Sequence, residues 1–234
     1  MSFFRGLRSK RLVASIISQV RPYSMVPDAG LALTITETLR VIDEDVRGDL
    51  TEFGTWMGGS SFAMLLAQRE VFGRVVKPVW MFDSFEGLPP AEERDGQAAI
   101  RYQANVDGSS YFDNCTAPLD KVKRAKESFG LSDSEAIIVP GWFDTTIPAN
   151  IDRLSERRIA LLRVDCDWYA PVKLVLDNAV PLVTENAPII LDDYYAWDGC
   201  AKATHDYLAE NQLPLRIRSV EGLAGAWMIK QSFE

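Results

Sequence analysis

The stretch Ile159-Ala-Leu-Leu-Arg-Val-Asp-Cys-Asp-Trp-Tyr169 decides the fold class of this sequence. A mostly apolar run, typical of a buried strand, is followed at once by Asp165 and Asp167. The pattern returns at 187–193, where another apolar run ends in Asp192 and Asp193. Adjacent acids at the end of a buried strand are costly unless a positive charge compensates them. Two such strands side by side would bring these carboxylates together at one sheet edge, which indicates a metal site.

The rest of the chain alternates between strand and helix patterns. This alternation predicts an α/β fold with a parallel sheet that binds ligands at the carboxyl ends of its strands. The polar stretch 84–118 has little periodicity, and we expect a lid or substrate loop there. We expect a single domain over 1–234, with N-terminal helices within 1–47. The strand candidates are 49–53, 79–82, 136–139, 159–164, 187–191, 215–220 and 224–230, and the main helix candidates are 12–20, 31–46, 62–72, 171–182 and 201–210.

The composition narrows the class of protein. The 234 residues are 47% hydrophobic and 25% charged, with a formal net charge of −8. This charge argues against a nucleic-acid partner, because no basic block persists beyond the N-terminus. The apolar run after that basic N-terminus is too short to span a bilayer, so we expect an ordinary helix and no membrane partner. The basic residues in question are Arg5, Arg8, Lys10 and Arg11.

Cysteine and histidine usage excludes several kinds of site. Cys115, Cys166 and Cys200 are widely spaced and form no CxxC pair. This pattern argues against a zinc site or a disulfide framework and favours a reducing, cytoplasmic compartment. His205 is the only histidine, so a histidine-dependent triad would depend on it alone. We expect His205 to be structural.

A glycine turn follows the first strand candidate. Gly54, Gly58 and Gly59 precede the helix at 62–72, where a ligand can approach the backbone and the helix N-terminus. Their spacing differs from the Gly-x-Gly-x2-Gly dinucleotide motif. Asp83 ends the second strand candidate, in the position that accepts hydrogen bonds from ribose hydroxyls. Each feature alone also fits an ordinary turn or cap, but together they indicate a nucleoside cofactor.

The acids that follow the later strands offer only oxygen ligands. Oxygen donors favour a hard cation such as Mg²⁺. A divalent cation lowers the pKa of a bound hydroxyl and fixes its orientation. Helix capping by Asp167 or Asp193 stays open as an alternative at this point.

Four segments resemble the macrocin O-methyltransferase family, whose members use S-adenosylmethionine (SAM) to methylate sugar hydroxyls on antibiotics. The resemblance extends from Arg21 to the last strand candidate. It implies a Rossmann-like class I methyltransferase fold, with a seven-stranded, mostly parallel sheet whose final strand is antiparallel. It also implies a homo-oligomer paired through the N-terminal helices. The segments are FDSFEGLPP at 82–90, GWFDTTIP at 141–148, VDCDWY at 164–169 and LDDYYAWDGCAKA at 191–203.

The same resemblance implies roles for individual residues. Asp165 is the expected general base and, with Asp192 and Asp193, an expected Mg²⁺ ligand. After Tyr169 the sequence departs from the family, because the usual Glu-Ser-Thr is replaced by Ala-Pro-Val, which leaves the acceptor contacts of this segment open. The residues expected to bind SAM are Met25, Glu52, Gly54, Ser60, Ser61, Asp83, Ser84, Trp142 and Asp144.

We therefore expect a SAM- and Mg²⁺-dependent O-methyltransferase whose acceptor is a hydroxyl of a sugar or a glycosylated natural product. Two alternatives remain open from the sequence. One is a methyltransferase-like protein that binds SAM without turnover. The other is an oxidoreductase with a nucleotide cofactor.

Overall fold

The computed structural model describes residues 10–108 and 111–231, which form a seven-stranded sheet in the order β3-β2-β1-β4-β5-β7-β6. β1 to β5 pair in parallel, whereas β7 is antiparallel to both of its neighbours. This topology confirms the predicted Rossmann-like sheet and its antiparallel last strand. The strands are β1 (Asp49–Phe53), β2 (Val79–Asp83), β3 (Ala136–Pro140), β4 (Ile159–Val164), β5 (Pro188–Leu191), β6 (Arg218–Ser219) and β7 (Ala226–Ile229).

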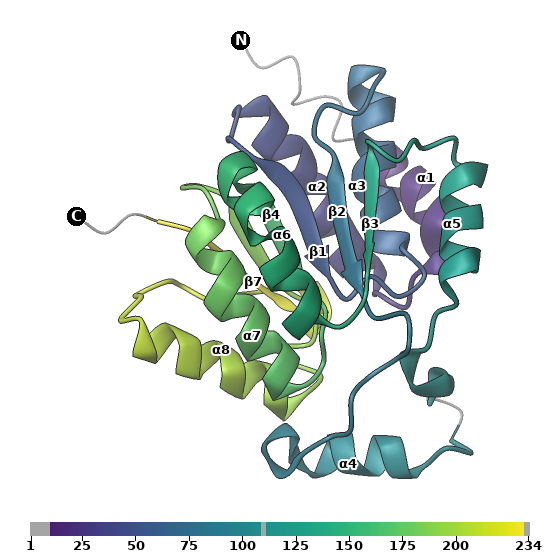
Figure 1. The fold of residues 1–234 in the computed structure, drawn as a ribbon. Helices are drawn as coiled ribbons and strands as arrows, with labels where there is room; N and C mark the ends of the chain where they lie inside the picture. The colour runs from purple at the N-terminus through teal and green to yellow at the C-terminus, as the bar shows by residue number, and fades with distance from the viewer. Residues whose placement is uncertain (1–9, 109–110, 232–234) are drawn as a thin grey trace.

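Helices cover both faces of the sheet (Figure 1). The helices α1, α2 and α3 pack against one another on one face, and on the other face α7 packs against both α6 and α8. Long connections within residues 84–118 place α4 beyond the carboxyl ends of the strands. The helices are α1 (Lys10–Val20), α2 (Asp28–Asp43), α3 (Gly59–Phe72), α4 (Gly96–Ala104), α5 (Leu119–Ser128), α6 (Phe143–Arg157), α7 (Tyr169–Ala179) and α8 (Asp198–Glu210).

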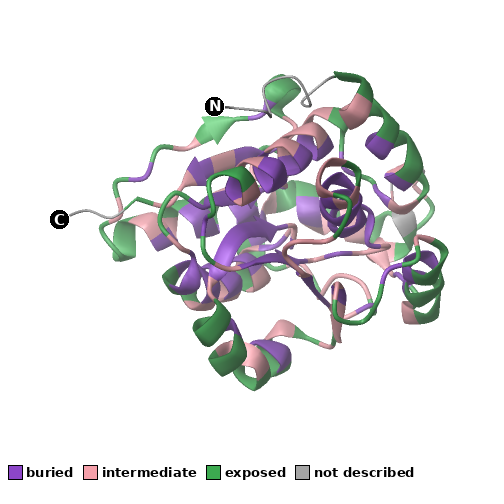
Figure 2. Ribbon diagram, turned by 90° about the horizontal axis from the view of Figure 1, so that it is seen from above, coloured by how far each residue is buried: buried purple, intermediate pink, exposed green. Residues whose placement is uncertain are grey.

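The central strands form the core. Every residue of β1 and β4 is buried, as the purple centre of Figure 2 shows. Strands covered on both faces are normally continuous apolar runs. Glu52 in β1 and Arg163 in β4 break this rule, and both are buried. Their positions near the carboxyl ends of adjacent strands mark the part of the sheet that serves the site.

Three sequence predictions differ from the structure. The strand expected at 215–220 is wrong in extent, since only Arg218–Ser219 pairs, at the sheet edge beside β7. Residues 84–118 contain α4 as well as loop. The helices α5 and α6 had no predicted counterpart, because α5 is mostly charged with few buried residues and α6 carries Pro148 inside.

The N-terminal helix begins at Lys10, and Arg5 and Arg8 lie outside the described residues. Throughout residues 10–108 and 111–231, each helix is too short or too polar to cross a lipid bilayer.

Candidate active site

A cavity of about 650 Å³ lies at the carboxyl ends of the central strands. It brings together most of the predicted cofactor residues and all three predicted metal ligands. Glu52 and Ser61 are the exceptions, since they are buried behind the cavity wall and do not line it. The predicted residues that line it are Met25, Gly54, Ser60, Asp83, Ser84, Trp142, Asp144, Asp165, Asp192 and Asp193.

The glycine turn owes its composition to close packing of the chain. Gly54 has φ +82°, and a Cβ there would lie 1.7 Å from the carbonyl oxygen of Asp165. A Cβ at Gly59 would lie 2.4 Å from Cβ of Ser24. The segment around Ser24 therefore lies directly on the first turn of α3. The glycines allow three parts of the chain to meet at the cavity, rather than simply opening the backbone to a ligand.

Asp83 holds this turn in place at the end of β2. Its Oδ2 accepts hydrogen bonds from the backbone N–H groups of Thr55 and Trp56, both at 2.8 Å, and its Oδ1 accepts one from Phe85 at 2.7 Å. Burial raises the pKa of Asp83, and these backbone donors oppose the rise.

Two polar atoms at this end of the cavity have no protein partner. Thr55 Oγ1 and Trp56 Nε1 are buried without a hydrogen bond within the described part of the chain, and both residues line the cavity. Buried polar groups are normally satisfied, so these atoms fit a site for a polar ligand. Thr55 was not among the site residues predicted from the sequence, where its only distinguishing feature is its position directly after Gly54.

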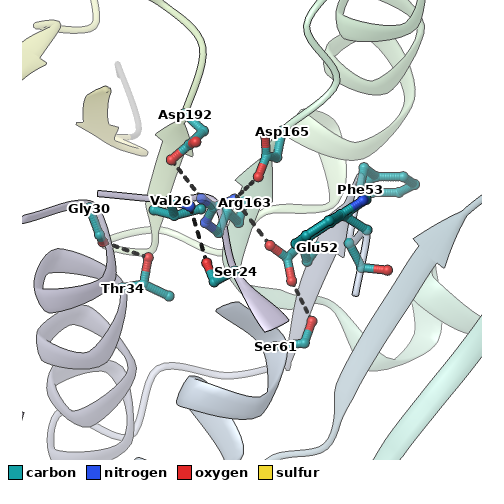
Figure 3. Close-up of polar contacts among 12 residues, drawn as sticks. Ser24, Val26, Gly30, Thr34, Glu52, Phe53, Ser61, Arg163, Asp165 and Asp192 are labelled. Atoms are coloured by element: carbon teal, nitrogen blue, oxygen red, sulfur yellow. Dashed lines mark hydrogen bonds and ion pairs between the residues drawn. The ribbon is translucent and has the colours of Figure 1, made fainter. Parts of the chain in front are cut away.

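Arg163 is fully buried, which is rare for arginine. Its Nη1 donates to Glu52 Oε1 at 3.0 Å and to Asp165 Oδ2 at 2.7 Å, and its Nη2 donates to Asp192 Oδ1 at 2.5 Å. Figure 3 shows the guanidinium between these three acids. Ser61 donates to the other oxygen of Glu52. Burial raises the pKa of Glu52 to about 7, opposed by the charge of Arg163.

A second group of acids, which shares Asp165 with the first, follows β4 and β5. Asp165, Asp167 and Asp193 each place a carboxylate oxygen within 4.8 Å of the others. Asp193 Oδ2 also accepts a hydrogen bond from the backbone N–H of Asp167 at 2.9 Å. All ligand atoms are carboxylate oxygens, so the group suits a hard divalent cation. Asp167 belongs to the strand-end acids that indicated a metal site in the sequence, although the ligands implied by the resemblance were Asp165, Asp192 and Asp193 only.

The pKa values of these acids reflect crowding of negative charge. Burial, followed by the charge of Asp165, raises the pKa of Asp167 to about 8. Burial and Asp167 raise the pKa of Asp193 well above its usual range. Burial raises the pKa of Asp192 to about 7 despite the opposing charge of Arg163. One buried arginine therefore compensates the acids only in part, which favours binding of a further cation.

One wall of the cavity is mostly apolar. The Tyr102 hydroxyl donates to the backbone carbonyl of Tyr111 at 2.5 Å, and the Trp197 side chain donates a hydrogen bond to the carboxylate of Asp167. The polar side chains of this wall are thus already paired. No Lys, Arg or His is among the described residues that line the cavity. The wall is formed by Leu88, Pro89, Tyr102, Cys115, Ala170, Pro171, Leu174 and Trp197.

His205 is outside the cavity lining. Its Nε2 lies 2.7 Å from the Tyr194 hydroxyl on the exposed side of α8. A structural role for His205 remains a prediction, and the cavity supplies carboxylates rather than imidazole for proton transfer.

This sheet topology defines the class of the protein, the Rossmann-like class I SAM-dependent methyltransferases. Residues 11–229 match the model of the Macrocin-O-methyltransferase (TylF) family. The chain therefore belongs to this family of O-methyltransferases, which favours methyl transfer over the oxidoreductase alternative.

Individual relatives agree with this assignment. The chain is 33% identical over 187 residues to 8-demethyl-8-(2,3-dimethoxy-alpha-L-rhamnosyl)-tetracenomycin-C 4'-O-methyltransferase of Streptomyces olivaceus, covering 80% of this chain and 68% of the relative. It is 35% identical over 173 residues to demethyldecarbamoylnovobiocin O-methyltransferase of Streptomyces niveus, covering 73% and 62%. The solved structure of the O-methyltransferase NovP superposes with a TM-score of 0.76 at 27% identity, covering 90% of this chain and 83% of that one.

Proposed function

We propose that this protein is a SAM- and Mg²⁺-dependent O-methyltransferase whose acceptor is a hydroxyl of a sugar in a glycosylated natural product. The observation that carries the proposal is one cavity that joins the Asp83 turn to the acid group at Asp165, Asp167 and Asp193. A cofactor end and an acid end in one space are what methyl transfer to a hydroxyl requires.

SAM supplies an electrophilic methyl group on a sulfonium. In the proposed reaction the acceptor oxygen forms a bond to that methyl carbon as the carbon–sulfur bond breaks. Asp165 lines the cavity at the acid end and takes the proton that the hydroxyl loses. The cationic cofactor suits a cavity lined by carboxylates. The unpartnered atoms of Thr55 and Trp56 add polar contacts at the cofactor end.

For the cation, we propose Asp165 and Asp193 as two of the ligands. Asp192 lines the cavity, and one of its carboxylate oxygens accepts a hydrogen bond from Arg163. Asp167 belongs to the group in which carboxylate oxygens of Asp165, Asp167 and Asp193 lie within 4.8 Å of one another. Asp192 and Asp167 are the candidates for the third ligand, and Asp192→Asn and Asp167→Asn separate them by their effect on Mg²⁺ affinity. A bound divalent cation would orient the acceptor hydroxyl and lower its pKa.

The apolar wall supports a neutral glycoside as the acceptor. No Lys, Arg or His is found among the described lining residues, so no basic side chain there pairs with the phosphates of a nucleotide sugar. Ala170 and Pro171, which replace the acid and hydroxyl usual in the family, extend this apolar character to α7. The acceptors named for the relatives, such as a rhamnosyl tetracenomycin, are glycosides.

The test is release of S-adenosylhomocysteine (SAH) from SAM with a panel of rhamnosides and other neutral glycosides of aromatic compounds. We expect turnover with at least one glycoside, loss of turnover on treatment with EDTA, and recovery on addition of Mg²⁺. Turnover that persists unchanged in EDTA would refute the metal role. SAM binding without turnover on any glycoside would instead favour the non-catalytic alternative.

Two further properties belong to the proposal. The three cysteines are free thiols, which supports a reducing, cytoplasmic location. Assembly into a homo-oligomer through α1 and α2 is expected by analogy with the family, and light scattering of the purified chain tests it.

A further inference from the structure

Arg163 lies where three parallel strands end. In the sheet register, Glu52 of β1 is opposite Arg163 of β4, and Arg163 is opposite Ile190 of β5. Side chains two positions apart on a strand share a face, so Asp165 and Asp192 follow on the same face as Arg163. Figure 3 shows all four side chains converging there.

The three acids differ in how far they are exposed. The side chain of Glu52 is 1% exposed, that of Asp192 14% and that of Asp165 25%. Glu52 therefore contacts the guanidinium from the interior, whereas Asp165 and Asp192 connect it to the cavity. The planar fork of arginine can serve three carboxylates at fixed angles, which a lysine ammonium cannot do.

We propose that Arg163 is a positioning residue for the proposed methyl transfer. Anchored by Glu52, it orients the carboxylate of Asp165, a proposed ligand of the divalent cation, and that of Asp192, a candidate for the third ligand. The inference rests on the proposed function, because it assigns a task to the same acids. It also gives Glu52 a role behind the cavity wall, as the anchor of Arg163.

The first test is Arg163→Lys, which keeps the positive charge and removes the fork. Partners of metal ligands typically contribute about 10–100-fold to metal affinity, and we expect a loss of that size in Mn²⁺ affinity. Mn²⁺ binding is followed by electron paramagnetic resonance of the free ion, at a temperature well below unfolding. We also expect kcat to fall while KM for SAM stays within about threefold, because the Asp83 turn is untouched.

Arg157→Lys is the matched control. Arg157 contacts Asp49 through Nε and Nη2, at the opposite end of β1, and does not line the cavity. This variant should change thermal stability without changing Mn²⁺ affinity. If the role of Arg163 were purely structural, both variants would change thermal stability and neither would change Mn²⁺ affinity.

Wild-type Mn²⁺ affinity in a folded Arg163→Lys protein would overturn the inference. If that variant does not fold, Glu52→Gln decides, since Glu52 does not line the cavity and accepts hydrogen bonds from Arg163 and Ser61. Weakened Mn²⁺ binding with normal SAH binding supports the inference, and normal Mn²⁺ binding overturns it. Failure of the wild-type protein to bind Mn²⁺ would instead refute the metal part of the proposed function, and the inference with it.

Discussion

Asp192 and Asp193 are neighbours in the chain, but their carboxylates have different partners. Asp192 accepts from Arg163 and faces α2, where an added Cβ on Gly30 would lie 3.6 Å from it. The carboxylate of Asp193 instead accepts a hydrogen bond from the backbone N–H of Asp167. Consecutive residues leaving a strand point to opposite sides, which explains the separation. The two acids are therefore not equivalent, and substitutions should distinguish them.

At Asp165 we predict a loss of turnover without loss of the cofactor. Asp165→Asn keeps the shape of the side chain but cannot take the acceptor proton, so kcat should fall about 10²–10⁴-fold. SAH affinity, measured by calorimetry, should stay near the wild-type value. The control is Asp177→Asn, an exposed position on α7 outside the cavity lining. Turnover by Asp165→Asn within tenfold of the wild type would remove Asp165 as the base.

Among the elements, α7 and the segment 84–118 are joined by one buried acid. Asp95 is 2% exposed, and its Oδ1 accepts from the backbone N–H of Tyr169 at the first turn of α7, at 2.6 Å. Its Oδ2 accepts from the N–H of Glu92 at 2.7 Å. Asp95 thus caps α7 from outside the helix and holds the 84–118 segment over the cavity.

Asp95→Ala should therefore loosen this segment as well as destabilise the protein. Removing the acceptor of these two partly buried backbone N–H groups costs about 1–3 kcal/mol. We expect that loss in urea unfolding, together with faster proteolytic cleavage within 84–118. Asp120→Ala, on an exposed ion pair of α5, is the comparison and should match the wild type in both assays. Equal cleavage rates in Asp95→Ala and Asp120→Ala would contradict the role of Asp95.

Helices and strands were predicted correctly where the local hydrophobic pattern of the sequence agreed with the burial of the element in the fold. β1 and β4 have the predicted bounds, and every residue of both strands is buried. The partnership of Asp95 with Tyr169, and those of Arg163 with Glu52 and Asp192, depend on contacts between segments far apart in the chain. No local pattern encodes these contacts, so Arg163 was not among the predicted site residues.

For the whole molecule, the sheet topology explains how one cavity can serve two tasks. The carboxyl ends of β1 and β2 form the proposed cofactor end around Asp83, and those of β4 and β5 form the acid end around Asp165 and Asp193. Parallel strands bring both ends to the same side of the sheet. A substitution at the acid end should therefore leave cofactor affinity unchanged, whereas a substitution at the Asp83 end should lower it.

Calorimetric titration of SAH into the wild-type protein and two variants tests this central claim most directly. We predict one site in the wild type, affinity lowered about 10–100-fold in Asp83→Ala through loss of a charged hydrogen-bond acceptor, and affinity within about threefold in Asp193→Asn. Absence of SAH binding in the wild type, or unchanged binding in Asp83→Ala, would contradict the account.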